Sequence, residues 1–222
     1  MKKIIILIGI ALILISFIVA YNSIKPTGKF IYSENLEVSV NGEKITSEDV
    51  ENIYAKIPDI QKEETTKEEI LNDLINQKLL LQEARKNGIE VTEQEVESYL
   101  GQLKSFNGLN EDELEEQIKI TGFTIDEYRN NLKDAITISK LLNQELDLQK
   151  IVVSDSEVES VLNGNGDLEE LLPEDDLEFE NALRDRIKQK LILDRQKELV
   201  SNYVESLRAR AQIEVRGGIV SE

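Results

Sequence analysis

The chain has 222 residues, with 26 Lys and Arg against 44 Asp and Glu, which gives a formal net charge of −18. It contains no Cys, no His and no Trp. These absences exclude disulfides, Cys/His zinc sites, thiol nucleophiles and every histidine-based catalytic triad. The acidic balance argues against a nucleic-acid binder, which needs a basic face. Composition therefore favours a protein that is not an enzyme or that works through carboxylates alone.

The N-terminal segment has the pattern of a membrane anchor. Two lysines follow the initiator Met, and residues 4–20 are uncharged and rich in Ile and Leu. As a helix these 17 residues would rise about 26 Å, close to the thickness of a bilayer core. Cleavage after Ala20 would leave Ile18 where a signal peptidase site carries a small residue. We therefore expect residues 1–23 to be an uncleaved single-pass transmembrane helix, with the bulk of the chain on the extracytoplasmic side of the cell membrane.

Short strands are expected near both ends of the exported part. After a linker over residues 24–35, residues 36–40 alternate apolar and polar side chains and meet Asn41-Gly42, which predicts a strand and a tight turn. Residues 212–215 alternate again and precede a tail over 217–222. Neither strand can satisfy its backbone groups alone, so we expect the two to pair and to pack against the C-terminal helix.

Helix signals fill the region between these strands. A cap residue followed three positions later by Glu predicts a helix start, and this spacing recurs at Thr66, Thr92, Asn110, Thr124 and Ser154. Ser47 is expected to cap an earlier helix that Pro58 stops, and Asn87-Gly88 to end the second one. Residues 177–211 are predicted to form one long helix with a single buried face: Phe179, Leu183, Ile187, Leu191, Leu199, Tyr203 and Leu207.

The order of these pieces resembles a known exported module. The segments that carry the resemblance are Val40-Asn41-Gly42-Glu43-x-Ile45, residues 74–96, and residues 123–129 with the sequence Phe-Thr-Ile-Asp-Glu-Tyr-Arg. From about Val38 to Val158 the chain resembles the N-terminal chaperone domain of the SurA and PrsA families, which are exported folding helpers. The resemblance implies a mainly α chaperone module over residues 36–216, with a small β element that joins the N- and C-terminal strands.

The chain departs from that family pattern at one place. In the family a parvulin-type prolyl isomerase domain follows the segment that corresponds to residues 151–158. Here fewer than twenty residues separate Val158 from Leu177, whereas a small domain needs about a hundred. An acidic linker over residues 163–176 is expected in place of the isomerase. We therefore expect no enzyme activity and no cofactor.

A holding chaperone is the function that these features favour. It needs an apolar concave surface that shields unfolded or newly exported polypeptides, and no catalytic group. No Gly-x-x-x-x-Gly-Lys-Ser/Thr motif occurs, so we expect it to act without ATP. It is expected to bind membrane through its N-terminal helix and to bind no nucleic acid. The client-binding candidates lie in the central helical lobe: Tyr99, Leu103, Phe106, Phe123, Tyr128 and Leu132.

Other functions fit the sequence less well. Asn163, Asn165, Asp167 and Glu174 match four positions of a calcium-binding EF-hand loop, but Leu168 stands where that loop needs Gly, and a plain acidic linker is favoured. Adjacent carboxylates such as Glu115 and Glu116 are typical of a solvated helix face rather than of a glycosidase site. A membrane-anchored adaptor for one specific partner, and an isomerase relative in name alone, remain alternatives.

Overall fold

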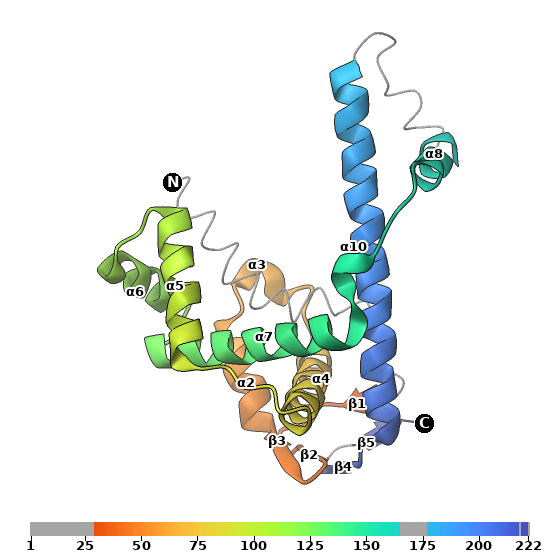
Figure 1. Cartoon of the computed structure of the whole chain (residues 1–222). Helices are drawn as coiled ribbons and strands as arrows, with labels where there is room; N and C mark the ends of the chain where they lie inside the picture. The colour runs from red at the N-terminus through yellow and green to blue at the C-terminus, as the bar shows by residue number, and fades with distance from the viewer. Residues whose placement is uncertain (1–28, 165–176, 218, 222) are drawn as a thin grey trace. The chain divides into compact units, whose positions relative to one another are not determined.

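The described residues of the computed structural model are 29–164, 177–217 and 219–221. The expected anchor over residues 1–23, and the expected acidic linker apart from its first two residues, lie outside these ranges. Among the helices of the described ranges, none combines the length with the apolar character that crossing a bilayer requires. The chain forms two compact units (Figure 1): one contains residues up to Leu141 and from Tyr203 onward, and the other spans residues 142–202.

A three-stranded antiparallel sheet joins the two ends of the first unit. Its strands are β2 (Glu37–Val40), β3 (Glu43–Thr46) and β4 (Ile213–Arg216), in the order β3-β2-β4. In the β2–β4 register Val38 lies opposite Val215. The predicted pairing of the N- and C-terminal strands is therefore confirmed.

The turn and the packing of this sheet follow from a few residues. Asn41 and Gly42 both have positive φ, 50° and 87°, as a tight two-residue hairpin turn requires. Val38 and Val40 are completely buried. The helices most in contact with the sheet are α2 (Ser47–Lys56) and α4 (Lys67–Lys86), rather than the C-terminal helix that we expected.

A second antiparallel pair of strands comes from the residues that directly precede and follow the three-stranded sheet in the sequence. Strand β1 (Lys29–Ile31) pairs with β5 (Ile219–Ser221). The segments expected to be a linker (24–35) and a tail (217–222) thus each contribute a strand, because each supplies the backbone partners that the other lacks. The Ser33 hydroxyl donates a hydrogen bond of 2.6 Å to the backbone carbonyl of Gly217, which ties the same two segments.

Four helices of the first unit begin where the capping pattern predicts. Helix α3 (Asp59–Lys62) lies between α2 and α4 in the sequence. Helices α5 (Glu93–Asn107), α6 (Glu111–Ile120) and α7 (Ile125–Leu146) follow α4. Side-chain caps form at Thr66, Thr92, Asn110 and Thr124. One prediction was wrong: Thr46, not Ser47, caps α2, because the Ser47 hydroxyl donates to the carbonyl of Glu34 at 2.7 Å.

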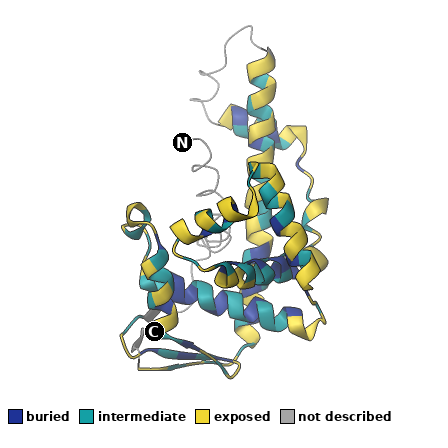
Figure 2. Ribbon diagram, turned by 90° about the vertical axis from the view of Figure 1, so that its left-hand side faces the viewer, coloured by how far each residue is buried: buried dark blue, intermediate teal, exposed yellow. Residues whose placement is uncertain are grey.

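Buried residues form stripes along these helices and leave the opposite faces exposed (Figure 2). One core cluster gathers apolar side chains from the segment that α5, α6 and α7 span: Val91, Val96, Leu100, Leu114, Ile118, Tyr128, Leu132 and Ile136. Leu71 and Ile75 of α4 are completely buried as well. The helical lobe thus has its own packed interior.

The last turns of α10 (Leu177–Arg210) are tied to α4 by a buried polar contact. Arg208 Nε donates to Asn76 Oδ1 at 2.7 Å, and its Nη2 donates to Asn72 Oδ1 at 3.0 Å. Both asparagines are buried, and a buried amide needs such partners. This contact secures the helix end that leads into β4.

The second unit consists of the turn η1 (Leu148–Lys150), α8 (Asp155–Gly164) and most of α10. Its apolar cluster contains Val153, Val158, Leu162 and Ile187. Arg195 pairs with Glu157, and Arg184 with Glu159. The predicted single buried face of α10 was wrong at two positions, since Phe179 is 45% exposed and Leu199 is 39% exposed.

Candidate functional site

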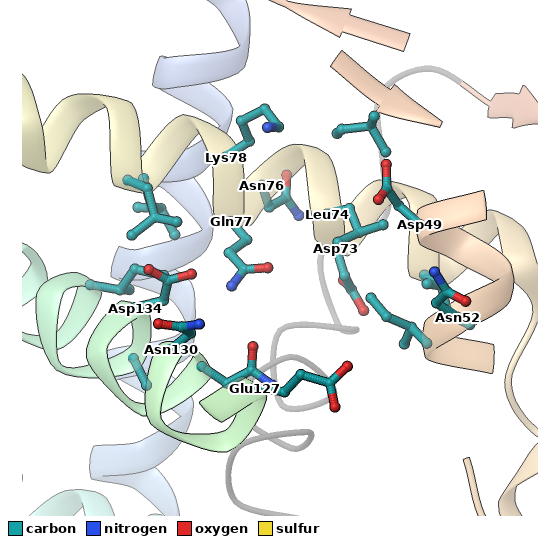
Figure 3. A pocket seen from close by; sticks show the side chains of 18 of the residues that line it. Asp49, Asn52, Asp73, Leu74, Asn76, Gln77, Lys78, Glu127, Asn130 and Asp134 are labelled. Carbon is teal, nitrogen blue, oxygen red and sulfur yellow. The ribbon is translucent and has the colours of Figure 1, made fainter. Parts of the chain in front are cut away.

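A groove of about 710 Å³ opens in the first unit, between α2, α4 and α7, with β3 contributing to its wall (Figure 3). All of its lining residues belong to this unit. A groove of this size lies in the range of ordinary ligand sites. It is therefore the candidate binding site.

Much of the groove lining is apolar. The apolar side chains come from all three helices, β3 and the neighbouring loops: Ile45, Ile53, Ile57, Ile70, Leu74, Leu80, Leu81, Phe123, Tyr128, Ala135 and Ile138. Leu74 and Leu81 of α4 are only half-buried. They face the groove, whereas Leu71 and Ile75 of the same helix fill the core. Helix α4 thus carries more apolar surface than its own packing uses.

Side-chain amides alternate with this apolar surface. Asn52 comes from α2, Gln77 from α4, and Asn130 and Asn131 from α7. Figure 3 shows Gln77 and Asn130 projecting from facing helices into the space between them. Within the described residues none of the four side chains has a hydrogen-bond partner. Each amide offers two donors and a carbonyl acceptor, so together they can pair with either kind of group on a ligand.

The basic side chains of the lining are already engaged by carboxylates. Lys56 Nζ lies 2.8 Å from Glu127 Oε1 and 4.3 Å from the centroid of the Phe123 ring. Lys78 and Arg85 both pair with Glu43, Lys78 at 3.4 Å. The groove therefore presents little unpaired positive charge.

Two carboxylates of the lining have raised pKa values. Burial raises the pKa of Asp73 to about 8, and the neighbouring Glu69 adds to the rise while Arg208 opposes it. Burial also raises the pKa of Asp134, against the opposing charges of Arg85, Lys133 and Lys78. A raised carboxyl pKa can mark a catalytic acid. However, the described residues that line the groove include no Cys, Ser or His that such an acid could serve in a catalytic pair.

Metal chemistry finds no support in the described part of the chain. No group of three or more acidic side chains there is arranged to hold a metal ion. The calcium-loop candidate falls mostly on residues 165–174, which lie outside the described ranges. What the groove offers is apolar contact, amide hydrogen bonds and a few carboxylates. This combination suits a binding site.

The six client-binding candidates fall into three settings. Phe123 and Tyr128 line the groove, and Tyr128 is also part of the lobe's core cluster, so that burial raises its pKa to about 12. Leu132 is buried in that cluster, and Leu103 packs against it. Tyr99 and Phe106 are exposed on α5, at 47% and 84%. The structure thus brings only two of the six into the groove, and client binding by any of them stays a prediction.

The groove residues of α2 and α4, including Ile53, Leu74 and Leu81, were not predicted from the sequence as site residues. A signal for α4 was present. From Ile70 to Leu81 apolar residues occupy more than one helix face, and such a helix is expected to contact something on its second face. For the amides no signal existed, because isolated Asn and Gln residues are common on helix surfaces.

The chain is similar in sequence to a domain that occurs in known proteins. The family model described as SurA-like N-terminal domain matches residues 1–142. Chaperone SurA of Bordetella pertussis is 31% identical over 119 residues, which are 54% of this chain and 22% of that protein. Foldase protein PrsA of Clostridium botulinum is 27% identical over 141 residues, 62% of this chain and 36% of that protein. The chain thus spans only part of the length of these curated relatives.

A solved structure has the same fold. It comes from a study of PEB4 and Cj1289, described as two structurally related SurA-like chaperones of Campylobacter jejuni. The TM-score is 0.58 at 14% identity, with 82% of this chain and 99% of that chain covered. At this identity the likeness supports the fold alone.

Proposed function

Because the chain belongs to the family of SurA-like N-terminal domains, we propose that it is an ATP-independent chaperone that holds unfolded or newly exported polypeptides in the groove. The observation that carries this proposal is the groove itself, with its apolar walls and the side-chain amides between them. Chaperone SurA and foldase PrsA relatives support the same class of function.

The apolar walls supply the attraction for an unfolded chain. Burying apolar surface contributes about 25 cal/mol per Å². Even two client side chains that become buried between Leu74 and Ile138 would therefore raise the affinity for the client several-fold. Apolar contact is indifferent to the exact client sequence. A client segment that lies in the groove is also withheld from aggregation with other unfolded chains.

The amides make it possible to bury the client's main chain. An extended segment carries a backbone donor and acceptor at nearly every residue, and each costs free energy when it is buried without a partner. Asn52, Gln77, Asn130 and Asn131 can pair with these groups regardless of client sequence. A groove lined only by leucines would bind side chains and leave the backbone unsatisfied.

We extend the proposal to the absence of catalysis. The segment between Val158 and Leu177 is too short for an isomerase domain. The chain should therefore not accelerate isomerisation of an X-Pro test peptide above background. A rate enhancement that scales with protein concentration would contradict this part of the proposal.

Attachment to the membrane is likewise proposed, on the strength of the apolar segment 4–20. The protein should fractionate with membranes and keep its N-terminal residues. External protease that cannot enter the cytoplasm should degrade the bulk of the chain. A mature form that begins near Tyr21 would contradict the anchor but not export.

The groove is tested with an aggregation assay and two matched variants. Light scattering of a chemically unfolded model protein is followed with the chain from residue 25 onward, which keeps every described element. Leu74→Gln places a polar group in the groove, and Leu193→Gln makes the same change at a position in the second unit that is 54% exposed. We expect suppression of aggregation by the wild type, several-fold weaker suppression by Leu74→Gln, and no change with Leu193→Gln. Equal suppression by both variants would show that clients bind elsewhere.

A further inference from the structure

We propose that Asp134 makes the groove selective for client segments that carry a Lys or Arg between apolar residues. The inference rests on the proposed function of the groove and names the kind of polypeptide that it prefers. It follows from the Asp134 carboxylate, which has no ion-pair partner among the described residues, and from the apolar side chains beside it in the groove wall.

Asp134 has no partner of its own in the described part of the chain. It lies on α7 in the groove wall, seven residues after Glu127, and its side chain projects towards the cavity (Figure 3). It is half-buried, and none of the hydrogen bonds or ion pairs among the described residues includes it. A carboxylate in this setting has lost part of its hydration without gaining a cation in return.

Three basic side chains interact electrostatically with Asp134, namely those of Arg85, Lys133 and Lys78. Arg85 and Lys78 both pair with Glu43, and Lys133 Nζ lies 2.7 Å from Glu93 Oε1. Their charge is therefore shared with other carboxylates. Burial still raises the pKa of Asp134 despite these three groups. A cation that came with the client would relieve the cost that the free groove retains.

The remaining charges of the lining do not supply a competing site. Glu127 is paired with Lys56, and Asp49 accepts hydrogen bonds from the backbone N–H and the hydroxyl of Thr46. Burial raises the pKa of Asp73 to about 8, so this side chain is mostly protonated near neutral pH. The fourth basic residue, Lys44, is paired with Glu37 at 2.9 Å. The uncompensated balance of the groove is acidic, so a client cation is attracted and a client carboxylate is repelled.

The neighbourhood of Asp134 also fits the shape of a basic side chain. Ala135 and Ile138 follow it on α7 and line the same groove. Lys and Arg have long aliphatic stems that pack on apolar surface while the charged end reaches a polar partner. A client Lys or Arg can therefore place its stem along the apolar wall and its charge at the carboxylate.

The test uses three matched peptides and the full chain in lipid nanodiscs. The peptides are short, unstructured and apolar, carry a fluorophore, and differ only in a central Lys, Gln or Glu. Anisotropy titration gives the three dissociation constants, with empty nanodiscs as the blank. We expect the Lys peptide to bind about fivefold more tightly than the Gln peptide, the scale of one partly exposed ion pair, and the Glu peptide to bind most weakly.

Two variants locate the effect. Asp134→Asn keeps the shape of the side chain and removes its charge, and it should reduce the Lys preference to less than twofold. Glu116→Gln makes the same charge change at an exposed position of α6 outside the groove lining, and it should leave the preference unchanged. In the wild type, raising the salt concentration to about 0.5 M should also weaken the preference, because salt screens a half-exposed pair.

The outcomes separate this inference from the proposed function. If all three peptides bind equally, or if Asp134→Asn retains the Lys preference, the role of Asp134 is wrong while the holding function stands. If no peptide binds but aggregation of an unfolded protein is still suppressed, the role of Asp134 is again wrong. If neither binding nor suppression is observed, both proposals fall.

Discussion

Val38 of β2 lies directly opposite Val215 of β4, so the first and last parts of the first unit are joined in one sheet. Val38 is completely buried, and Val215 is half-buried. The pairing also gives β2, the central strand, a partner on its second edge. The C-terminal residues are therefore part of the folded unit.

Deleting residues 212–222 should destabilise the first unit. The deletion removes β4 and β5 and exposes Val38 and Val40, and each buried aliphatic side chain contributes about 1.5–3 kcal/mol. A loss of several kcal/mol is a large share of the roughly 5–15 kcal/mol that stabilises a domain. Thermal unfolding followed by circular dichroism should show a clearly lower melting temperature. An unchanged melting temperature would mean that the strand pairing contributes nothing to stability.

The Arg208 contact with α4 should contribute to the same stability. Arg208→Leu leaves the buried amides of Asn72 and Asn76 without their donor, and an unsatisfied buried polar group costs about 1–3 kcal/mol. Arg208→Lys retains the charge but cannot reach both asparagines with a planar fork, so it should recover only part of the loss. Denaturant unfolding of the three proteins checks this order. If Arg208→Leu is as stable as the wild type, the contact has no net value.

Two glycines that both have positive φ should respond differently to alanine. Gly88 has φ +67° and open space where an alanine Cβ would lie, whereas a Cβ on Gly217 (φ +73°) would lie 2.1 Å from the carbonyl oxygen of Asn35. Both substitutions incur the left-handed backbone penalty of about 1–2 kcal/mol. Gly217→Ala must also displace backbone, at a further cost of about 1–3 kcal/mol. Equal destabilisation by the two variants in denaturant unfolding would show that the 33–35 segment moves freely away from Gly217.

Local signals predicted most of the fold, and longer-range relationships were harder to predict. The capping boxes at Thr66 and Thr92 act within one helix turn, so the sequence alone located those helix starts. The cap at Thr46 was missed by one residue, because the choice against Ser47 depends on a bond to Glu34, which is distant in sequence. Likewise, strands β1 and β5 are each too short to recognise without knowing that they meet.

The groove shows the same limit at the level of the site. Its walls come from α2, α4 and α7, and their juxtaposition depends on tertiary packing that no single segment encodes. The aromatic residues chosen from sequence identified Phe123 and Tyr128, which lie near the start of α7. They did not indicate Gln77 or Asp134, because a polar residue on a helix becomes informative only when the opposite wall is known.

The last prediction concerns pH and the groove carboxylate Asp73. Its pKa is raised from 3.8 to about 8 by burial, so in the native protein it keeps a proton that the unfolded chain releases near pH 4. Where the native state binds more protons than the unfolded state, stability decreases as the pH rises. The contribution of Asp73 is therefore fully present below about pH 4 and is lost as the pH rises through about pH 8, by at most about 1.4 kcal/mol per pH unit.

Asp73→Asn should remove this dependence. The variant keeps the shape of a protonated carboxyl group, so its free energy of unfolding should change less than that of the wild type between about pH 5 and pH 8. At the upper end of this range it should be the more stable protein.

Glu95 and Glu127 do not interfere in this range. Their hydrogen bonds with Lys140 and Lys56 lower both pKa values to about 2, so the stability they contribute is lost only as the pH falls below about 4.5. Asp134→Asn is the matched control, with a smaller effect in the same direction, since burial raises that pKa as well. Urea unfolding at a series of pH values measures all three proteins. If the free energy of unfolding changes with pH in Asp73→Asn as it does in the wild type, Asp73 is ionised in the native groove at neutral pH, and burial does not raise its pKa.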